Sequence, residues 1–509
     1  MVASARTGQG EVFAFLADPA THGLREPVRR IDTHGAAVFL AGKDVYKVKR
    51  AVSYPFMDFS TLEKRRFFCE RELAVNKVNA PELYLGVVPV SRDGSRLKFG
   101  SGDVIEWAVH LRRFDENHTL DWLAARGELD HEIIAKLADA AVQSHLRAET
   151  VTLAQALPAL KRHIEETLAE LEAAAEIFPG ENVKKLQDAM GQAFAQNESL
   201  LAEREKQGEV RRCHGDLHLR NIAMIGGAPV LFDAIEFDES IATCDVLYDL
   251  AFLLMDLWTR GLTREANLLF NRYLWLCDKV EIRIKGLSAL PLFLSLRAAI
   301  RAKVAILQPG PASSQEVSAR RLFDAALGFL APAGRDLVAI GGLSGTGKSS
   351  LAAELGALIG RPPGAVILRS DIERKRLFGA SEFTRLPGDA YLPQTTARVY
   401  ERLRGLAAAV LSAGQSAILD AVNLRPEERS AAERIAAQNH ARFTGLWLEA
   451  PLGTLEERVS KRTKDASDAT AEIVAAQAKQ PPGAMAWRRL DTSDSLEATA
   501  ASALAAIMR

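Results

Sequence analysis

The sequence contains little cysteine and carries almost no net charge. Its four cysteines, at positions 69, 213, 244 and 277, form no CxxC pair. Their scatter argues against a zinc site or a disulfide framework and favours reduced thiols in a reducing compartment. The 64 basic and 65 acidic residues leave a net charge of −1, so no overall field draws the chain onto nucleic acid or a membrane surface.

Long hydrophobic runs are also missing. No segment approaches the ~20 consecutive apolar residues of a membrane-spanning helix, and the first residues lack the basic region and apolar core of a secretory signal. We therefore expect a cytoplasmic protein without a membrane partner. Hydrophobic residues make up 48% of the chain and charged residues 25%, which is typical of globular proteins. These proportions predict folded domains and leave the oligomeric state open.

Length and local composition indicate more than one domain. A chain of 509 residues is too long for one hydrophobic core, since domains commonly hold about 150 residues. Proline, glycine and serine cluster at 308–315, and a second such segment at 331–334 follows a short helical pattern. Clusters of this kind mark connections between packed units. We predict a first domain at 1–325, a linker at 326–335 and a second domain at 336–509.

The two domains differ in their expected secondary structure. In the first, β-type runs at 37–52 and 86–113 flank a helical pattern at 61–79, and an Ala- and Leu-rich stretch at 129–205 predicts several long helices. This is an α+β, bilobal arrangement with a small β-rich lobe before a larger helical lobe. In the second domain, apolar strands alternate with helices, which predicts an α/β domain with a parallel sheet. Its predicted strands are 337–340, 365–368, 416–419 and 442–448.

A phosphate-binding motif opens the second domain. The segment from Gly342 to Ser349 fits GxxxxGK[ST], directly after an apolar strand and directly before a helical run, which is the context that a P-loop requires. Its backbone N–H groups and the helix N-terminus cradle phosphates, while Lys348 neutralises their charge and Ser349 ligates Mg²⁺. The predicted ATP-binding residues are Gly342, Ser344, Gly345, Thr346, Gly347, Lys348, Ser349 and Ser350.

Two acidic residues follow later strands of this domain. Asp371 comes after the second predicted strand, where ligands bind in open α/β sheets, and a carboxylate there can accept the proton of an attacking hydroxyl. Arg374, one turn further on, is suited to an anionic substrate. The alternative for Asp371 is a helix N-cap on a solvated surface. Asp420 ends the third predicted strand, the position of a Walker B carboxylate that orders Mg²⁺.

These segments resemble the P-loop kinases of the polynucleotide kinase, gluconate kinase and zeta toxin group. The resemblance covers nearly all of residues 336–509 and rests on an SDxxRK segment at 370–375 and a DxxNLxPxxR segment at 420–429. It implies a substrate-binding role for Asn423 and a lid in which Arg458 and Arg462 reach the transferring phosphates. Ordinary i,i+4 surface contacts with nearby acids are the alternative for both arginines.

The first domain carries a second constellation suited to phosphoryl transfer. His214-Gly-Asp216-Leu-His-Leu-Arg-Asn221 is followed by a strand-like segment that contains Asp233. An Asp and an Asn five residues apart, followed by an Asp after a short hairpin, supply a base for the acceptor hydroxyl and two Mg²⁺ ligands. We predict that Asp216 is the base and that Asn221 and Asp233 are the ligands.

This loop resembles that of aminoglycoside phosphotransferases and choline-kinase-like enzymes, whose HGDxHxxN pattern it matches. The resemblance implies that Lys47 contacts the ATP phosphates, that Glu72 is its helical partner and that Asp249 accepts loop hydrogen bonds. Lys49 lies on the same strand face as Lys47, and Glu70 is an alternative to Glu72. The first domain has no GxGxxG loop, which members of this family often lack.

The whole arrangement resembles the bacterial proteins described as bifunctional aminoglycoside phosphotransferase/ATP-binding proteins. It implies a phosphotransferase with two kinase-type sites that uses ATP and Mg²⁺. The expected acceptor is a hydroxyl on a small metabolite, a sugar or a nucleotide or nucleic-acid 5′ end, although net charge gives nucleic acid no support. The alternative is a regulatory ATPase or nucleotide-binding protein in which one domain transfers no phosphate. These motifs do not specify the acceptor, aminoglycosides included.

Overall fold

The computed structural model describes residues 6–54, 57–151, 155–306, 312–462 and 465–508. The chain forms two compact units, of which unit 1 comprises Met1–His163 and Ala202–Leu253 and unit 2 comprises Ile164–Leu201 and Leu254–Arg509. Within the described ranges, no helix combines the length and apolarity needed to cross a membrane.

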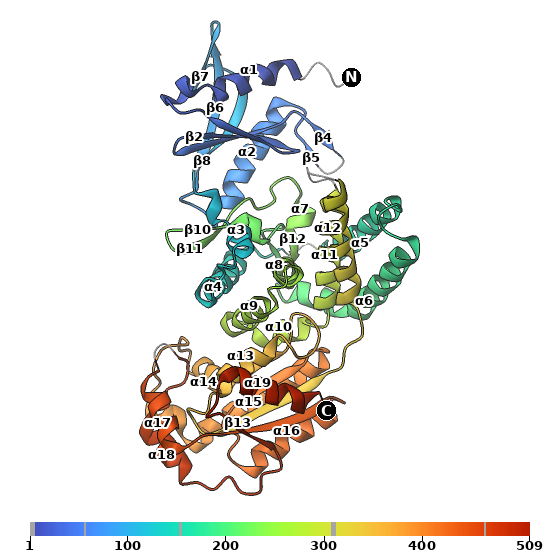
Figure 1. Cartoon of the computed structure of the whole chain (residues 1–509). Coiled ribbons are helices and arrows are strands. Elements are labelled where there is room, and N and C mark those ends of the chain that lie inside the picture. Colours follow the sequence, from blue (N-terminus) through green and yellow to red (C-terminus); the bar gives the residue numbers. More distant parts are fainter. Residues whose placement is uncertain (1–5, 55–56, 152–154, 307–311, 463–464, 509) are drawn as a thin grey trace. The chain divides into compact units, whose positions relative to one another are not determined.

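Unit 1 begins with a six-stranded antiparallel sheet and a helix packed against it (Figure 1). The strand order is β1-β2-β3-β8-β6-β7, and helix α2 contacts β6 and β8. β2 and β3 form the predicted hairpin, which turns at Gly42 with a φ of 60°. Cys69 of α2 is buried in the same core cluster as Leu83 and Val109. The bounds are α1 Arg6–Ala17, β1 Arg29–Asp32, β2 Ala36–Ala41, β3 Asp44–Lys49, β4 Ser53–Tyr54, β5 Met57–Asp58, α2 Leu62–Lys77, β6 Tyr84–Asp93, β7 Arg96–Phe99 and β8 Asp103–Arg112.

The remainder of unit 1 is mainly helical and contains two short antiparallel strand pairs. β10 pairs with β11, and β12 pairs with β9. The HGD segment lies between β9 and β10, and Asp233 follows β11. The two segments adjoin, because the Ile235 N–H donates to the carbonyl oxygen of His214 at 3.0 Å. The bounds are α3 Leu120–Ala125, α4 His131–Arg147, β9 Val210–Arg212, β10 Ile222–Ile225, β11 Ala228–Leu231, α7 Glu239–Ala242, β12 Thr243–Asp245 and α8 Val246–Thr259; helices α5 and α6 span Ala156–Ala173 and Gly180–Lys206.

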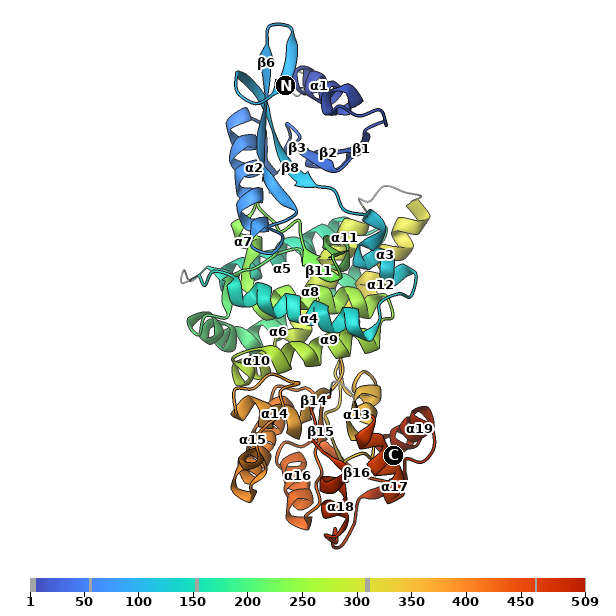
Figure 2. The same cartoon turned by 90° about the vertical axis from the view of Figure 1, so that its left-hand side faces the viewer.

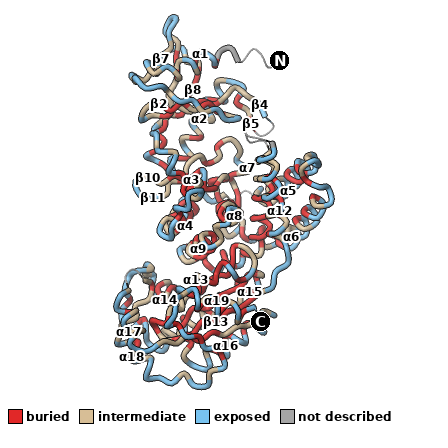
Figure 3. The backbone as a smooth tube through the Cα atoms, viewed as in Figure 1, coloured by how far each residue is buried: buried red, intermediate tan, exposed pale blue. Residues whose placement is uncertain are grey.

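Unit 2 contains a five-stranded parallel sheet in the order β14-β15-β13-β16-β17 (Figure 2). All seven residues of the central strand β13 are buried, and helices α13, α15 and α16 contact it. Figure 3 shows buried residues along these strands. The bounds are β13 Asp336–Gly342, α13 Lys348–Gly356, β14 Val366–Arg369, α14 Ser370–Leu377, α15 Pro393–Ser412, β15 Ala417–Asp420, α16 Pro426–Gln438, β16 Arg442–Glu449, α17 Leu452–Ser460, α18 Ala471–Ala478, β17 Arg488–Asp491 and α19 Leu496–Ile507.

The predicted fold classes are confirmed: an α+β region in the first part of the chain and a parallel α/β sheet in the second. The four predicted strands of the second domain correspond to β13, β14, β15 and β16. The fifth strand, β17, escaped prediction because its sequence, RRLD, contains a single apolar residue.

Unit 2 also includes helices that precede the parallel sheet in sequence, among them those between α8 and β13. The latter are α9 Thr263–Leu276, α10 Val280–Gly286, α11 Leu290–Ile306 and α12 Ala312–Phe329. α12 packs against α11 and ends in the buried Phe329. The linker predicted at 326–335 therefore begins inside a helix, since Ala326 and Phe329 are buried residues of α12. Residues 308–311 of the 308–315 cluster lie outside the described residues, and the domain boundaries stay a prediction.

Helix α9 covers the edge of the parallel sheet that strand β14 forms. β14 is an edge strand, whose unpaired backbone groups need partners when they are buried. Three side chains spaced four residues apart on α9 supply them. Asn267 donates to the carbonyl oxygens of Pro363 (2.9 Å) and Ala365 (3.1 Å). The remaining contacts, from Asn271 to Ala365 and Ile367 and from Trp275 to Ile367, have N···O distances between 2.7 and 3.1 Å.

Candidate active sites

The P-loop of unit 2 has a backbone that glycine alone fits at two positions. Gly342 and Gly345 have φ angles of 139° and 89°, a region that disfavours other residues. A Cβ at Gly342 would lie 2.6 Å from the carbonyl oxygen of Leu448, and one at Gly345 would lie 2.7 Å from that of Leu455. The loop leads from β13 into the N-terminus of α13. This is the phosphate-binding geometry that the motif predicts.

Lys348 folds back over this loop. Its Nζ donates to the carbonyl oxygens of Gly342 and Leu343, each at 2.9 Å. Burial lowers the pKa of the Lys348 ammonium to about 8, although the charges of Asp420 and Asp371 oppose that shift. The ammonium is thus held beside the loop and short of counter-charge, which suits it to an incoming anion.

A hydroxyl and a carboxylate meet next to the loop in a way that fits Mg²⁺. The Ser349 hydroxyl donates to Asp420 Oδ2 at 2.6 Å, and Asp420 is buried at the end of β15. Both groups supply the hard oxygen ligands that Mg²⁺ prefers. Ser349 and Asp420 are therefore the residues of unit 2 that could hold this ion.

Asp371 lies close to these groups, in the first turn of α14. The N-cap of that helix is Arg369, so the alternative of an N-cap aspartate is wrong. Burial raises the pKa of the Asp371 carboxyl, and the nearby Arg369 and Lys348 act against that rise. A carboxylate with a raised pKa accepts a proton more readily, as a general base must.

Arg374 of the same helix is buried and faces the segment before α15. Its guanidinium donates to the carbonyl oxygen of Ala390 at 2.5 Å and to the Thr396 hydroxyl at 3.3 Å. It lies 4.9 Å from the ring centroid of Tyr391. Its Nε is buried without a hydrogen-bond partner. The predicted anion-binding role of Arg374 stays a prediction.

The remaining predicted site residues of unit 2, Asn423, Arg458 and Arg462, differ in their contacts. The Asn423 amide donates to the carbonyl oxygens of Ile340 (3.4 Å) and Ala421 (3.3 Å), so it supports the strand ends. Arg458 donates to the carbonyl oxygen of Thr492 at 2.7 Å. Arg462, by contrast, contributes through its charge to the lowered pKa of Lys348. The charge of Arg462 thus acts on the P-loop lysine, whereas Arg458 is bound to Thr492, and their phosphate-binding roles stay predictions.

Sequence reasoning missed three polar residues around this site. Gln477 of α18 accepts a hydrogen bond from the backbone N–H of Ser344 at 2.9 Å. Asp468 accepts from Lys375 at 2.8 Å and from the Tyr391 hydroxyl at 2.6 Å. Arg369 forms an ion pair with Asp420. Only Arg369 had a detectable signal, its place at the carboxyl end of an apolar strand.

The site of unit 1 is built around two lysines and one buried glutamate. Lys47 Nζ lies 2.8 Å from Glu72 Oε1 and 2.6 Å from Asp233 Oδ1. Lys49 pairs with Glu72 Oε2 and with Glu236. Glu72 is fully buried. Both lysines of strand β3 therefore contact the same helical acid, a geometry that the choice between Lys47 and Lys49 did not anticipate.

Glu70 points elsewhere. It pairs with Arg66 at 2.9 Å on the exposed side of α2, so the geometry selects Glu72 as the partner of the lysines. Burial opposes ionisation of Glu72, but the charges of Lys47 and Lys49 outweigh it and lower the pKa of its carboxyl. The nucleotide-binding role of this set stays a prediction.

The predicted base and metal ligands of unit 1 are drawn together by the HGD loop. The Asn221 amide donates to Asp216 Oδ2 at 2.9 Å and to the Asp216 carbonyl oxygen at 3.0 Å. Asp233 has a φ of 61°, and its N–H donates to the Tyr84 hydroxyl at 3.1 Å. Such left-handed backbone is uncommon outside glycine and is frequent at functional sites. The oxygen-rich set of Asn221 and Asp233 fits Mg²⁺.

Asp249 holds the HGD loop through hydrogen bonds. Its carboxylate accepts the backbone N–H groups of His214 (3.3 Å) and Gly215 (2.8 Å). His145 Nε2 also lies 3.2 Å from Asp249 Oδ2. His145, His214, Gly215 and Asp249 are all buried. The prediction that Asp249 accepts loop hydrogen bonds is confirmed.

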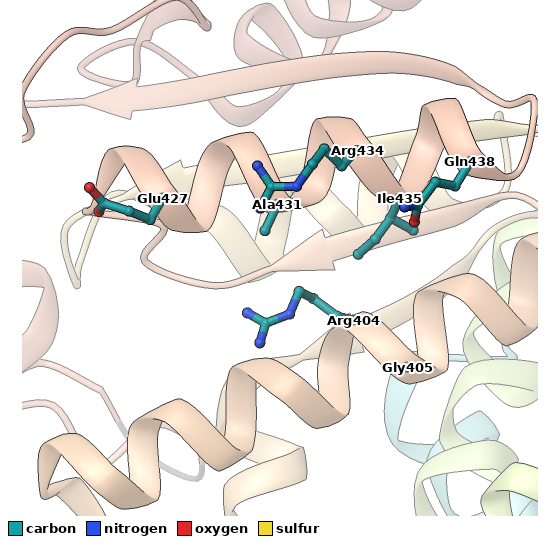
Figure 4. Close-up of a pocket in the computed structure, with 7 residues that line it drawn as sticks. All are labelled: Arg404, Gly405, Glu427, Ala431, Arg434, Ile435 and Gln438. Atoms are coloured by element: carbon teal, nitrogen blue, oxygen red, sulfur yellow. The ribbon is translucent and has the colours of Figure 1, made fainter.

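A cleft of about 550 Å³ lies between α15 and α16 (Figure 4). None of the predicted site residues lines it, so it is separate from the two phosphate-handling constellations. It is lined by Arg404, Gly405, Glu427, Ala431, Arg434, Ile435 and Gln438.

Residues 337–481 match a protein-family model described as an AAA domain. Uncharacterized proteins of Mycobacterium tuberculosis and Mycobacterium bovis are 29% identical to this chain over 473 residues, which cover 91% of this chain and 92% of theirs. The matched family region contains the P-loop, Asp371 and Asp420.

Similar solved structures resemble separate parts of the chain. A choline/ethanolamine kinase family protein from Mesorhizobium loti is 16% identical, covers 64% of this chain and 99% of its own, and has a TM-score of 0.38. The APS kinase of Mycobacterium tuberculosis in complex with AMPPNP and APS is 21% identical, covers 35% of this chain and 100% of its own, and has a TM-score of 0.27.

Proposed function

We propose that this protein is an ATP-dependent phosphotransferase with two kinase-type sites, each transferring the γ-phosphoryl group of ATP to a hydroxyl acceptor. The observation that carries the proposal is the meeting of Ser349, Asp420, Lys348 and Asp371 around the P-loop of unit 2. A nucleotide-binding module needs the first three of these groups. A carboxylate beside them, that of Asp371, is the extra element that acceptor activation requires.

In unit 2, the loop amides and the α13 N-terminus bind the phosphates, and Lys348 neutralises charge that develops on the β- and γ-oxygens. Ser349 and Asp420 are the proposed Mg²⁺ ligands. The ion, when bound with ATP, neutralises the triphosphate and orders it for in-line transfer. Asp371 orients the acceptor hydroxyl and takes its proton as the new P–O bond forms and the bond from the γ-phosphorus to the bridging oxygen of the departing ADP breaks.

In unit 1, Lys47 is the proposed phosphate ligand, held in place by Glu72. Asp216 is the proposed base, and its carboxylate is oriented by the Asn221 amide. Asn221 and Asp233 are the proposed Mg²⁺ ligands. The same division of labour therefore recurs on a different fold, with a lysine, an oxygen-rich metal set and a base. The proposed acceptors are small metabolites, sugars and nucleotide-like compounds, in the cytoplasm.

The test is a screen of the full-length chain for acceptors that gain the mass of one phosphate in the presence of ATP and Mg²⁺. Lys348→Ala should lower transfer at the unit 2 site by ~10²-fold or more, and Asp216→Asn should do so at the unit 1 site. Lys461→Ala and Asp93→Asn, both exposed ion-pair residues, are the matched controls. ATP hydrolysis that Lys348→Ala abolishes, with no acceptor phosphorylated, would support a regulatory ATPase instead. Turnover that neither variant changes would refute both assignments.

A further inference from the structure

Arg369 occupies a position at the unit 2 site that the proposed mechanism leaves without a role. It is the last residue of β14, and the parallel register places it directly beside Asp420, the last residue of β15. Its side chain is only 11% exposed. An arginine is seldom buried unless its charge is paired, so the partners of this guanidinium indicate what it does.

The guanidinium of Arg369 connects the proposed metal ligand to the segment between α17 and α18. Its Nε lies 3.3 Å from Asp420 Oδ2, and a terminal nitrogen lies 3.3 Å from Asp465 Oδ1. The first of these contacts is an ion pair without a hydrogen bond, since the buried Nε has no hydrogen-bond partner. The Nε–H of Arg369 therefore donates no hydrogen bond in this arrangement.

Two further features describe the surroundings of the guanidinium. Its central carbon lies 5.7 Å from the ring centroid of Trp275, whose own Nε1–H is bound to the Ile367 carbonyl oxygen at 3.0 Å. The charge of Arg369 also acts on Lys348 and on Asp371. The guanidinium is thus anchored within electrostatic reach of the phosphate-binding lysine and the proposed base.

We propose that Arg369 is a further catalytic cation of the unit 2 site, which pairs with Asp420 and Asp465 in the nucleotide-free protein and releases Asp420 to bind the transferring phosphoryl group when Mg²⁺ and ATP enter. This inference rests on the proposed phosphotransfer at that site. It assigns to Arg369 a phosphate-contacting role of the kind that the family resemblance implies for Arg458 and Arg462, and of these two Arg458 has its guanidinium bound to Thr492.

Electrostatic repulsion explains why Arg369 leaves Asp420 when Mg²⁺ binds there. Asp420 cannot serve a guanidinium and a divalent cation equally well, because the two positive charges repel at this distance in a partly buried site. The incoming triphosphate supplies oxygens that match the planar donors of arginine. Asp465 stays within reach of the terminal nitrogen, so the side chain keeps one anchor throughout.

The experiment compares Arg369→Gln and Arg369→Lys with Arg272→Gln in the full-length chain. Arg272 is also a partly buried arginine of unit 2, paired with Glu382 at 2.7 Å, and belongs to neither site. All chains carry Asp233→Asn, which removes the negative charge of a proposed metal ligand of unit 1 and so weakens metal binding there. Three quantities are measured: kcat for ATP turnover, Mn²⁺ affinity without nucleotide by electron paramagnetic resonance, and affinity for ATP in EDTA.

Arg369→Gln should lower kcat by ~10²-fold or more, weaken metal-free ATP binding, and strengthen Mn²⁺ binding by about five- to tenfold because the competing cation is gone. Arg369→Lys should recover part of each effect, and Arg272→Gln should change none. Opposite signs for metal and nucleotide separate this role from a structural one, which would weaken both.

Loss of Mn²⁺ affinity in Arg369→Gln, or a kcat within twofold of the parent, overturns the proposal. A fold defect is recognised from the circular dichroism of the glutamine variant, in which case the lysine variant decides, because it keeps the charge but loses the planar donors. An unmutated chain that turns over no ATP refutes the proposed function. The two binding measurements then still decide the ion-pair exchange, because they need no turnover.

Discussion

The α9 contacts with β14 predict that Asn271 stabilises this edge of the parallel sheet. Its Oδ1 accepts the Ile367 N–H at 2.7 Å, and its Nδ2 donates to the Ala365 carbonyl oxygen at 3.1 Å. Asn271→Ala leaves the Ile367 N–H buried without an acceptor, which costs about 1–3 kcal/mol. Loss of the donated bond adds about 0.5–1.5 kcal/mol. We expect local opening of β14 to become easier by about 1.5–4.5 kcal/mol.

Hydrogen exchange of the backbone amides at 365–369 measures this opening directly, and it avoids the two-state assumption that a chain with two units violates. A change of 2 kcal/mol or more corresponds to exchange at least ~30-fold faster. Asn267→Ala should have a smaller effect, because the Ala365 carbonyl oxygen keeps its bond from Asn271.

Asn439→Ala is the matched control, since its amide donates to Ile435 of its own helix at 2.8 Å. It should leave exchange at 365–369 unchanged. Exchange in Asn271→Ala within threefold of this control would refute the reasoning, because the side-chain contacts would then add nothing to the burial of the edge strand.

Three further outcomes follow from the described contacts. A fragment of residues 336–509 lacks α9 and exposes the β14 edge, so size-exclusion chromatography should show it aggregating more than a fragment of 254–509; equal behaviour would contradict the role of α9. Glu72→Gln leaves Lys47 and Lys49 short of a buried counter-charge and should cost about 3–5 kcal/mol in denaturant unfolding of unit 1, whereas Glu70→Gln should change stability by less than about 1 kcal/mol. Burial lowers the pKa of His214 below its ordinary 6.5, so the unfolded state binds the proton first and stability should fall as pH drops below about 6.5. His214→Gln should flatten that part of the stability profile, and a slope equal to that of the unmutated chain would refute the assignment.

Local motifs explain why the P-loop could be predicted from the sequence. The glycines at 342 and 345 are required by the loop's own backbone angles and by close approach to neighbouring carbonyls, so motif and geometry coincide within a few residues. The same holds for Asp216 and Asn221, which are joined by a hydrogen bond across five positions. Chemistry that lies within one loop is encoded where it acts.

Contacts between distant segments could not be predicted in this way. The choice between Glu70 and Glu72 depends on which side of α2 faces the sheet, and helical spacing in a charged segment leaves that side undefined. Arg458 lies one turn before Arg462, yet the fold binds it to Thr492. Asn267, Asn271 and Trp275 share one face of α9 at four-residue spacing, but nothing local indicates that their partners lie over 90 residues later.

The edge strand β14 connects the local site residues with the contacts between distant segments. Its backbone is held by α9 at Ala365 and Ile367, and two residues later the chain reaches Arg369, followed by Asp371 in the first turn of α14. A strand rises about 3.3 Å per residue, so a shift of the strand by even part of one residue would misplace both side chains relative to Asp420. Catalytic geometry is sensitive to displacements of about 1 Å. The helix that covers the sheet edge therefore helps to position Arg369 and Asp371, even though it lies outside the region that the AAA-domain model matches.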